Sequence, residues 1–331
     1  MVPLLSVVVP CHNEAATLEE LCRQVEAACA GVIELEMVVV NDGSKDETLS
    51  IARGIAAANP HVRLLSFSRN FGKEAAMLAG LRASTGDAVI IMDGDLQHPP
   101  SLIPDLVKGW LVDGFDQVLA QRDRTGDPWL RSQVSKLYYR MVNALMDVKL
   151  QDGVGDFRLM SRRVVDAILG LCERNRFSKG LFAWVGFPST TITYTNVVRT
   201  AGESSWSGRA LLNYGIDGVL SFNSQPLRLA IHLGLWSFLV FVAYAVWLVI
   251  SRFFTGIEMP GYITTIAVIV GVGGLQVLFL GVIGEYIGRI YYEVKARPVY
   301  ILAEDSSAGS SGGSSADSAG SGGPDPAQES R

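Results

Sequence analysis

The chain has 331 residues, a formal net charge of -5 and a hydrophobic share of 49%. This length fits one or two domains, and the slightly acidic balance gives no reason to expect nucleic acid as a partner. The four cysteines show no C-x-x-C spacing, so we expect neither a zinc site nor a disulfide framework. The N-terminus has no basic and apolar signal sequence, so the first domain is expected in the cytoplasm.

Short apolar strands alternate with helices through the first 120 or so residues. The pattern predicts strands over 4–10, 35–40, 62–68, 89–92 and 118–121, and helices over 15–30, 44–58 and 74–84 and from about 101. Ser44 and Glu47 have the spacing of a capping box, which predicts the start of the second helix. Such alternation is typical of an α/β fold with a doubly wound, mostly parallel sheet.

Ligands of such sheets bind beyond the carboxyl ends of the strands. The loops at that edge carry both acids and bases, namely Glu14, Asp42, Arg69, Lys73, Asp93, Asp95 and Arg122. No G-x-G-x-x-G follows the first strand, so the dinucleotide fingerprint is missing. The mixed charge favours a nucleoside diphosphate held through a metal ion and basic side chains. Asp42 either accepts hydrogen bonds from a base or ribose or caps the following helix.

The fourth strand ends in Asp93-Gly94-Asp95, and two prolines soon follow. Two carboxylates this close repel each other unless a positive charge lies between them. Gly94 allows the backbone to turn so that both face one point, and Gln97 offers a third oxygen. The expected occupant is a hard divalent cation, Mg²⁺ or Mn²⁺. The alternative is a solvated acidic loop in front of a helix.

The middle of the chain has a less regular pattern. An amphipathic helix is expected over 128–146, and residues 190–199 alternate like a strand. Between them, residues 153–159 form an expected glycine-loosened turn that holds Asp156 and Arg158. These two side chains either pair with each other or face a ligand.

Two long segments without charge follow, over 229–250 and 262–283. Each has the length that crosses a bilayer, about 20 residues, so we expect a transmembrane hairpin. Residues 208–227 are either core packing or, as their position favours, an interfacial amphipathic helix. Arg289, Lys295 and Arg297 follow the second span, which places both termini in the cytoplasm. A post-membrane segment is expected over 285–303 and a disordered, Ser/Gly-rich tail over 304–331.

Several strings occur in order along the chain: VVVPCHNE, VVVNDGSKDET, SRNFGKEAA, MDGDLQHPP, GDFRLM, DGVLSFNSQPLRL and GEYIGRIYYEVKARPVYI. Together they resemble the polyprenyl-phosphate glycosyltransferases of glycosyltransferase family 2, which include bactoprenol glucosyltransferases and dolichol-phosphate mannose synthase. The resemblance covers about residues 4–302. It implies a cytoplasmic GT-A catalytic domain over 1–207, the hairpin over 228–284 and a place in a bacterial plasma membrane.

The resemblance also implies roles for single residues. The implied metal ligands are Asp93, Asp95 and Gln97, and the implied reacting centre contains Asp156 and Arg158. The implied nucleotide-sugar site contains Pro10, Asn13, Glu14, Asp42, Lys73, Asp93 and Arg122, and the implied acceptor-phosphate site contains Arg131, Arg199 and Ser204. Relatives commonly have Gly-x-Ser-Lys where this chain has Ser205 at the lysine position. Either Arg199 or Arg209 takes the place of that lysine, or the acceptor loop is arranged differently.

The implied activity is the transfer of one sugar, with inversion, to a polyprenyl phosphate such as undecaprenyl phosphate. Glucose from UDP-glucose is the favoured donor; mannose from GDP-mannose, GalNAc and an amino sugar are alternatives. A processive polysaccharide synthase is less expected, because no Q-x-x-R-W occurs and two spans are few for a channel. A membrane-tethered, non-catalytic nucleotide-sugar-binding protein is the remaining alternative. The expected partners are the donor, the lipid acceptor and the membrane, and a homo-oligomer is compatible with the pattern.

Overall fold

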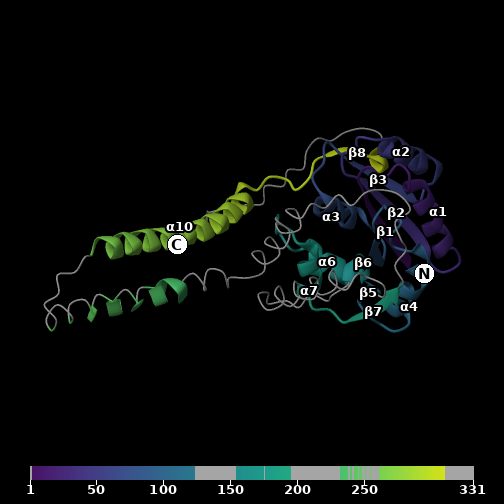
Figure 1. The fold of residues 1–331 in the computed structure, drawn as a ribbon. Helices are drawn as coiled ribbons and strands as arrows, with labels where there is room; N and C mark the ends of the chain where they lie inside the picture. The colour runs from purple at the N-terminus through teal and green to yellow at the C-terminus, as the bar shows by residue number, and fades with distance from the viewer. Residues whose placement is uncertain are drawn as a thin grey trace, which may run out of the picture.

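A mixed β-sheet forms the centre of the computed structural model, which describes residues 2–123, 154–174, 176–194 and 261–309 and short helical stretches between 232 and 254. Within these residues the sheet has eight strands in the order β7-β5-β6-β4-β1-β2-β3-β8. One long helix, α10, projects away from the sheet domain (Figure 1). The predicted α/β class with helices on both faces of the sheet is confirmed.

The parallel part of the sheet comprises β1 (Leu4–Cys11), β2 (Glu34–Asn41), β3 (Val62–Phe67) and β4 (Ala88–Ile91). β1 lies between β2 and β4, with Val7 opposite Met37 and Ile90. The centre of each strand is fully buried because helices cover both faces, which explains the near-continuous apolar runs. All four strands lie where the sequence predicts them.

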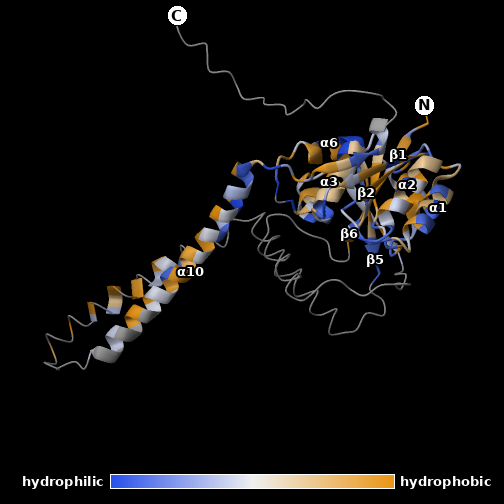
Figure 2. Ribbon diagram, turned by 90° about the horizontal axis from the view of Figure 1, so that it is seen from above, coloured by the Kyte–Doolittle hydropathy of each residue, from blue (hydrophilic) through white to orange (hydrophobic). Residues whose placement is uncertain are grey.

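The helices divide between the two faces (Figure 2). α1 (Leu18–Cys29), α2 (Thr48–Ala58), η1 (Pro100–Leu102) and α4 (Ile103–Leu111) pack on one face. α3 (Lys73–Ala83), α6 (Arg162–Leu169) and α7 (Ser178–Trp184) pack on the other. α3 lies so close to the sheet that a Cβ at Gly80 would lie 2.2 Å from Cγ1 of Val8. Only glycine fits this contact.

The other part of the sheet is built around an antiparallel strand. β6 (Val154–Ser161) lies between β4 and β5 (Gln117–Arg122) and is antiparallel to both, while β5 pairs in parallel with β7 (Ser189–Tyr194). The prediction of a loose turn over 153–159 was therefore wrong. The glycines suggest a turn, but Phe157, Leu159 and Met160 are fully buried in the sheet, and this burial outweighs the local preference.

The capping box predicted at Ser44 and Glu47 was also wrong. α2 begins at Thr48, and Glu47 makes no side-chain cap bond. Oδ1 of Asp46 accepts a hydrogen bond from the Thr48 N–H (3.0 Å), and Oγ of Ser44 accepts one from the Asn13 N–H (3.0 Å). Ser44 thus ties the loop after β2 to the loop after β1.

The long helix α10 (Tyr262–Lys295) has 34 residues, so it is about 51 Å long at 1.5 Å per residue. Its segment Gly271–Lys295 is long and apolar enough to cross a membrane. The helix begins where the second span was predicted and continues twelve residues beyond residue 283. The stretches between 232 and 254 run beside it (Figures 1 and 2), and a Cβ at Gly234 would lie 3.4 Å from the Phe279 ring.

After α10 the chain returns to the sheet. β8 (Leu302–Asp305) pairs antiparallel with β3 and is followed by η2 (Ser306–Gly309). Arg63 forms an ion pair with Asp305 (2.7 Å), and the Tyr300 ring stacks on Phe67 with centroids 5.0 Å apart. The prediction that the tail begins at residue 304 was therefore wrong for 304–309. The strand has only four residues and directly precedes the Ser/Gly/Ala-rich stretch, and its partner lies some 240 residues earlier.

Candidate active site

A cavity of about 300 Å³ lies at the carboxyl ends of β1, β2 and β4, the edge at which the sequence predicts ligand binding. Its lining residues come from four separate segments of the chain: Pro10, Cys11, His12, Glu14, Asp42, Asn70, Gly72, Lys73, Ala76, Asp93, Gly94 and Asp95. Four carboxylates and one ammonium group thus face the same space. This size suits a small polar molecule. Because carboxylates outnumber the ammonium group, a phosphate-bearing molecule would fit only together with a cation.

Asp42, after β2, fixes the loop that leads into α3. Its carboxylate accepts hydrogen bonds from the backbone N–H groups of Phe71 (2.6 Å) and Gly72 (2.9 Å). It does not cap α2, the alternative that the sequence left open. Gly72 has a φ of 96°, a conformation that favours glycine. The backbone at the start of Lys73 is therefore held in place by Asp42.

The acidic turn after β4 contributes Asp93 and Asp95 to the cavity. Oδ1 of Asp95 accepts a hydrogen bond from the Gln97 N–H (3.1 Å), and the Gly94 carbonyl accepts one from Oγ1 of Thr17 (2.7 Å). The left-handed residue of this turn is Leu96, with a φ of 59°. Gln97 does not line the cavity, so its described contribution is to hold Asp95.

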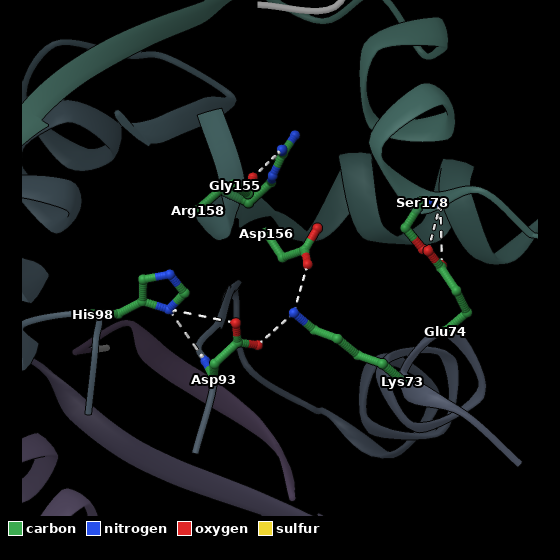
Figure 3. Close-up of polar contacts among 8 residues, drawn as sticks. All are labelled: Lys73, Glu74, Asp93, His98, Gly155, Asp156, Arg158 and Ser178. Carbon is green, nitrogen blue, oxygen red and sulfur yellow. Dashed lines mark hydrogen bonds and ion pairs between the residues drawn. The ribbon is translucent and has the colours of Figure 1, made fainter. Parts of the chain in front are cut away.

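Lys73 joins the two parts of the sheet (Figure 3). Its Nζ lies 2.6 Å from Oδ1 of Asp93 and 2.6 Å from Oδ2 of Asp156, which comes from β6. Partial burial opposes the charge on Lys73, but the two carboxylates outweigh it and raise the pKa of this lysine. Burial likewise opposes ionisation of Asp156, but Lys73 and Lys179 outweigh it and hold the Asp156 pKa well below its usual range. Asp156 is therefore a carboxylate at neutral pH.

Arg158 lies two residues after Asp156 and is only 3% exposed. Its Nη2 donates to the Gly155 carbonyl (2.7 Å), and its guanidinium lies 4.3 Å from the centre of the Phe182 ring. Its Nε has no hydrogen-bond partner among the described residues. Burial lowers the pKa of Arg158 to about 10, which still leaves it positive at neutral pH. It adds positive charge near Asp156 without a direct bond to it in the described contacts.

Two side chains that sequence patterns did not single out support these groups. His98 stacks on Phe157 with ring centroids 5.0 Å apart, and its Nδ1 accepts a hydrogen bond from the Asp93 N–H (3.3 Å). The Glu74 carboxylate accepts hydrogen bonds from the N–H and Oγ of Ser178, and burial raises its pKa to about 7. Phe157 and Ser178 lie far along the chain from His98 and Glu74, so spacing gave no signal for these two contacts. The only hint was that Glu74 follows Lys73 and that His98 lies close to the acidic turn.

The acidic turn fits a hard divalent cation in its chemistry. Asp93 and Asp95 offer carboxylate oxygens to one cavity, and Mg²⁺ typically takes one or two carboxylates together with substrate phosphates. In the described part of the chain, no group of three or more His, Cys, Asp or Glu residues is placed to hold a metal ion. A metal at this turn would therefore need further ligands from a bound diphosphate or water.

The other predicted site residues are less informative. Arg122 is the last residue of β5. Asn13 accepts a hydrogen bond from the Lys45 N–H (2.9 Å) and does not line the cavity. The predicted acceptor residues lie outside the described residues: Arg131, Arg199 and Ser204. So do the expected helices over 128–146 and 208–227 and the end of the expected strand over 190–199.

This sheet and its charged rim define a glycosyltransferase of the GT-A type. A model described as glycosyl transferase family 2 matches residues 6–169, and one described as the GtrB C-terminal hairpin matches residues 225–290. The chain belongs to glycosyl transferase family 2, and the resemblance that its motifs indicate is confirmed.

Full-length relatives sharpen this assignment. The chain is 47% identical to the Bacillus subtilis (strain 168) protein CsbB, named as a glycosyltransferase, over 91% of this chain and 92% of the relative. It is 43% identical to the bactoprenol glucosyl transferase of Shigella phage SfII, over 90% and 97%. The glucosyl-3-phosphoglycerate synthase of Mycobacterium tuberculosis, solved with Mn²⁺ and UDP-glucose, has a TM-score of 0.46 at 23% identity, covering 66% of this chain and 79% of that one.

Proposed function

We propose that this glycosyltransferase transfers a single glucosyl residue from UDP-glucose to a polyprenyl phosphate, with inversion, at the cytoplasmic face of a membrane. The relatives named bactoprenol glucosyl transferase support both the sugar and the lipid, because they match over nine-tenths of this chain. The apolar helix α10 supports a lipid-bound acceptor, since it can hold the catalytic domain at a bilayer.

The observation that carries the proposal is the ion-pair bridge from Asp93 through Lys73 to Asp156. It brings the acidic turn of β4 and the strand β6 to within one side chain of each other. A donor diphosphate would bind near Asp93 and Lys73, and β6 would face the sugar. Asp93 and Asp95 would hold a Mg²⁺ or Mn²⁺, which would supply charge stabilisation for the departing diphosphate.

The chemistry needs little proton transfer. A phosphate monoester has its second pKa near 6, so the acceptor is largely a dianion at neutral pH. One of its oxygens forms a bond to the anomeric carbon while the bond from that carbon to UDP breaks. Asp156 has a depressed pKa, which makes it a poor base. Its proposed work is to orient Lys73 and the sugar, so positioning supplies most of the rate.

The direct test is a transfer assay with the purified full-length protein in detergent. We expect radiolabel from UDP-glucose to pass into an organic-soluble product only when undecaprenyl phosphate and Mg²⁺ or Mn²⁺ are present. Mass spectrometry of that product should show one hexose per lipid phosphate. A panel of UDP-GalNAc, GDP-mannose and UDP-amino sugars measures donor choice. A polymer, or donor binding without transfer, would contradict the proposal and favour a processive synthase or a binding protein.

A further inference from the structure

Lys73 has a fixed backbone and a partly exposed side chain. Hydrogen bonds to Asp42 hold the backbone just before it, while its side chain is 43% exposed. The two carboxylates that it contacts are less exposed, at 27% for Asp93 and 12% for Asp156. The lysine is thus the component of this bridge that can most readily leave.

The two ends of the bridge differ in their other possible partners. Asp93 belongs to the acidic turn, where a divalent cation would compete with Lys73 for the same carboxylate oxygen. Asp156 lies on β6, near the positive charges of Lys179 and Arg158. A divalent cation arriving at Asp93 must therefore break one ion pair and accept a positive neighbour, which raises the cost of binding.

We propose that Lys73 is a displaceable counterion that couples metal binding to donor binding; this proposal rests on the proposed function. Without a donor, Lys73 neutralises Asp93 and weakens the binding of a divalent cation. A nucleoside diphosphate brings negative charge that Lys73 can contact instead, while its ion pair with Asp156 remains. Metal and nucleotide then favour each other's binding by the same factor, as thermodynamic linkage requires. A lysine suits this exchange because its ammonium is a point charge on a flexible stem.

The test measures Mn²⁺ binding to the full-length protein in detergent, from the electron paramagnetic resonance signal of free Mn²⁺, with and without UDP. We expect Lys73→Met to bind Mn²⁺ alone about tenfold more tightly than the wild type, since a competing charge is gone. We also expect UDP to strengthen Mn²⁺ binding in the wild type and to do so much less in Lys73→Met. Lys73→Arg, which keeps the charge, should stay close to the wild type.

Two controls locate the effect. Lys45→Met removes an exposed lysine that does not line the cavity, so Mn²⁺ affinity should not change. Asp93→Asn should weaken Mn²⁺ binding with either residue at position 73. Unfolding midpoints confirm that each variant is folded.

The proposal fails if Lys73→Met binds Mn²⁺ no more tightly than the wild type, if UDP strengthens Mn²⁺ binding equally in both, or if no form binds Mn²⁺. These readouts do not depend on transfer. A protein that shows the expected binding pattern but transfers no glucose would therefore contradict the proposed function alone.

Discussion

Asp42 and Asp156, which come from the two parts of the sheet, are held by different means. In the parallel part, Asp42 is fixed by two backbone N–H groups of the next loop, so its geometry depends on the main chain. In the antiparallel part, Asp156 of β6 is held by the side chain of Lys73, which comes from a helix that packs across the sheet. Groups held by the main chain are set once the sheet forms, whereas groups held by a lysine can respond to a ligand.

The largest effect that tests this contrast is expected at the acidic turn. Asp93→Asn should lower turnover on the order of a thousandfold, because it removes a charge that would hold the metal at the leaving diphosphate. Steady-state transfer rates at saturating donor measure it. Asp113→Asn, at an exposed residue outside the cavity, is the control. Near-normal, metal-dependent transfer by Asp93→Asn would refute the assignment of the turn.

A smaller but still large loss is expected on β6. Asp156→Asn should lower turnover by about a hundredfold, because Lys73 loses one of its two partners and the sugar loses a positioning group. If Asp156 only orients groups, the shape of the pH–rate profile between pH 6 and 8 stays the same in the variant. A residual rate that climbs steeply with pH would instead show that Asp156 acts as a base.

The contact between α3 and α7 predicts a change in stability with pH. The carboxyl of Glu74 faces Ser178, with Asp156, Lys73 and Arg176 as its charged neighbours. Its folded pKa of about 7 lies above the ordinary value of 4.5, so the folded state binds the proton more tightly. This stabilisation is present below pH 4.5 and is lost as the pH rises through 7.

Glu74→Gln tests this directly, because the amide cannot ionise. When the pH rises from 5 to 8, the free energy of unfolding of the variant should increase by about 2 kcal/mol relative to that of the wild type. This amount already allows for solvent around the half-buried group. Chemical unfolding of the two proteins at both pH values measures it. An equal difference at pH 5 and pH 8 would show that Glu74 keeps an ordinary pKa.

The smallest effect is expected at the opposite edge, where β8 joins β3. Arg63→Ala should cost about 1 kcal/mol of stability, because its ion pair with Asp305 is partly shielded from water. Arg53→Ala should cost less, since its pair with Glu304 is more exposed. Double-mutant cycles with the two acidic partners measure both pairs. A larger coupling for the exposed pair would contradict this ranking.

The sequence predicts the parallel part of the molecule well and the rest less well, for a physical reason. β1 to β4 are apolar runs bounded by turn residues, so local pattern is enough to find them. β6 was missed because Gly153 and Gly155 suggest a turn, and β8 because it has only four residues and directly precedes a Ser/Gly-rich stretch. Both strands are stabilised by burial or ion pairs with residues far away along the chain. No short window of sequence contains those residues.

The same limit applies to the site. The acidic turn, Glu14, Asp42 and Lys73 were found from their places after strands, and all of them line the cavity. The ion-pair bridge from Asp93 through Lys73 to Asp156 was not found, because it joins residues about 20 and 80 positions apart. The contacts of His98 with Phe157 and of Glu74 with Ser178 were missed for the same reason.

The return of the chain through β8 has a mechanical consequence. Only six residues join Lys295, the last residue of α10, to Leu302, the first residue of β8, which pairs with β3 at the edge of the sheet. Since an extended chain spans at most about 3.5 Å per residue, this connection keeps the end of α10 within about 25 Å of the sheet. If α10 lies in a bilayer as proposed, the catalytic domain cannot move farther from the lipid surface than this short connection allows.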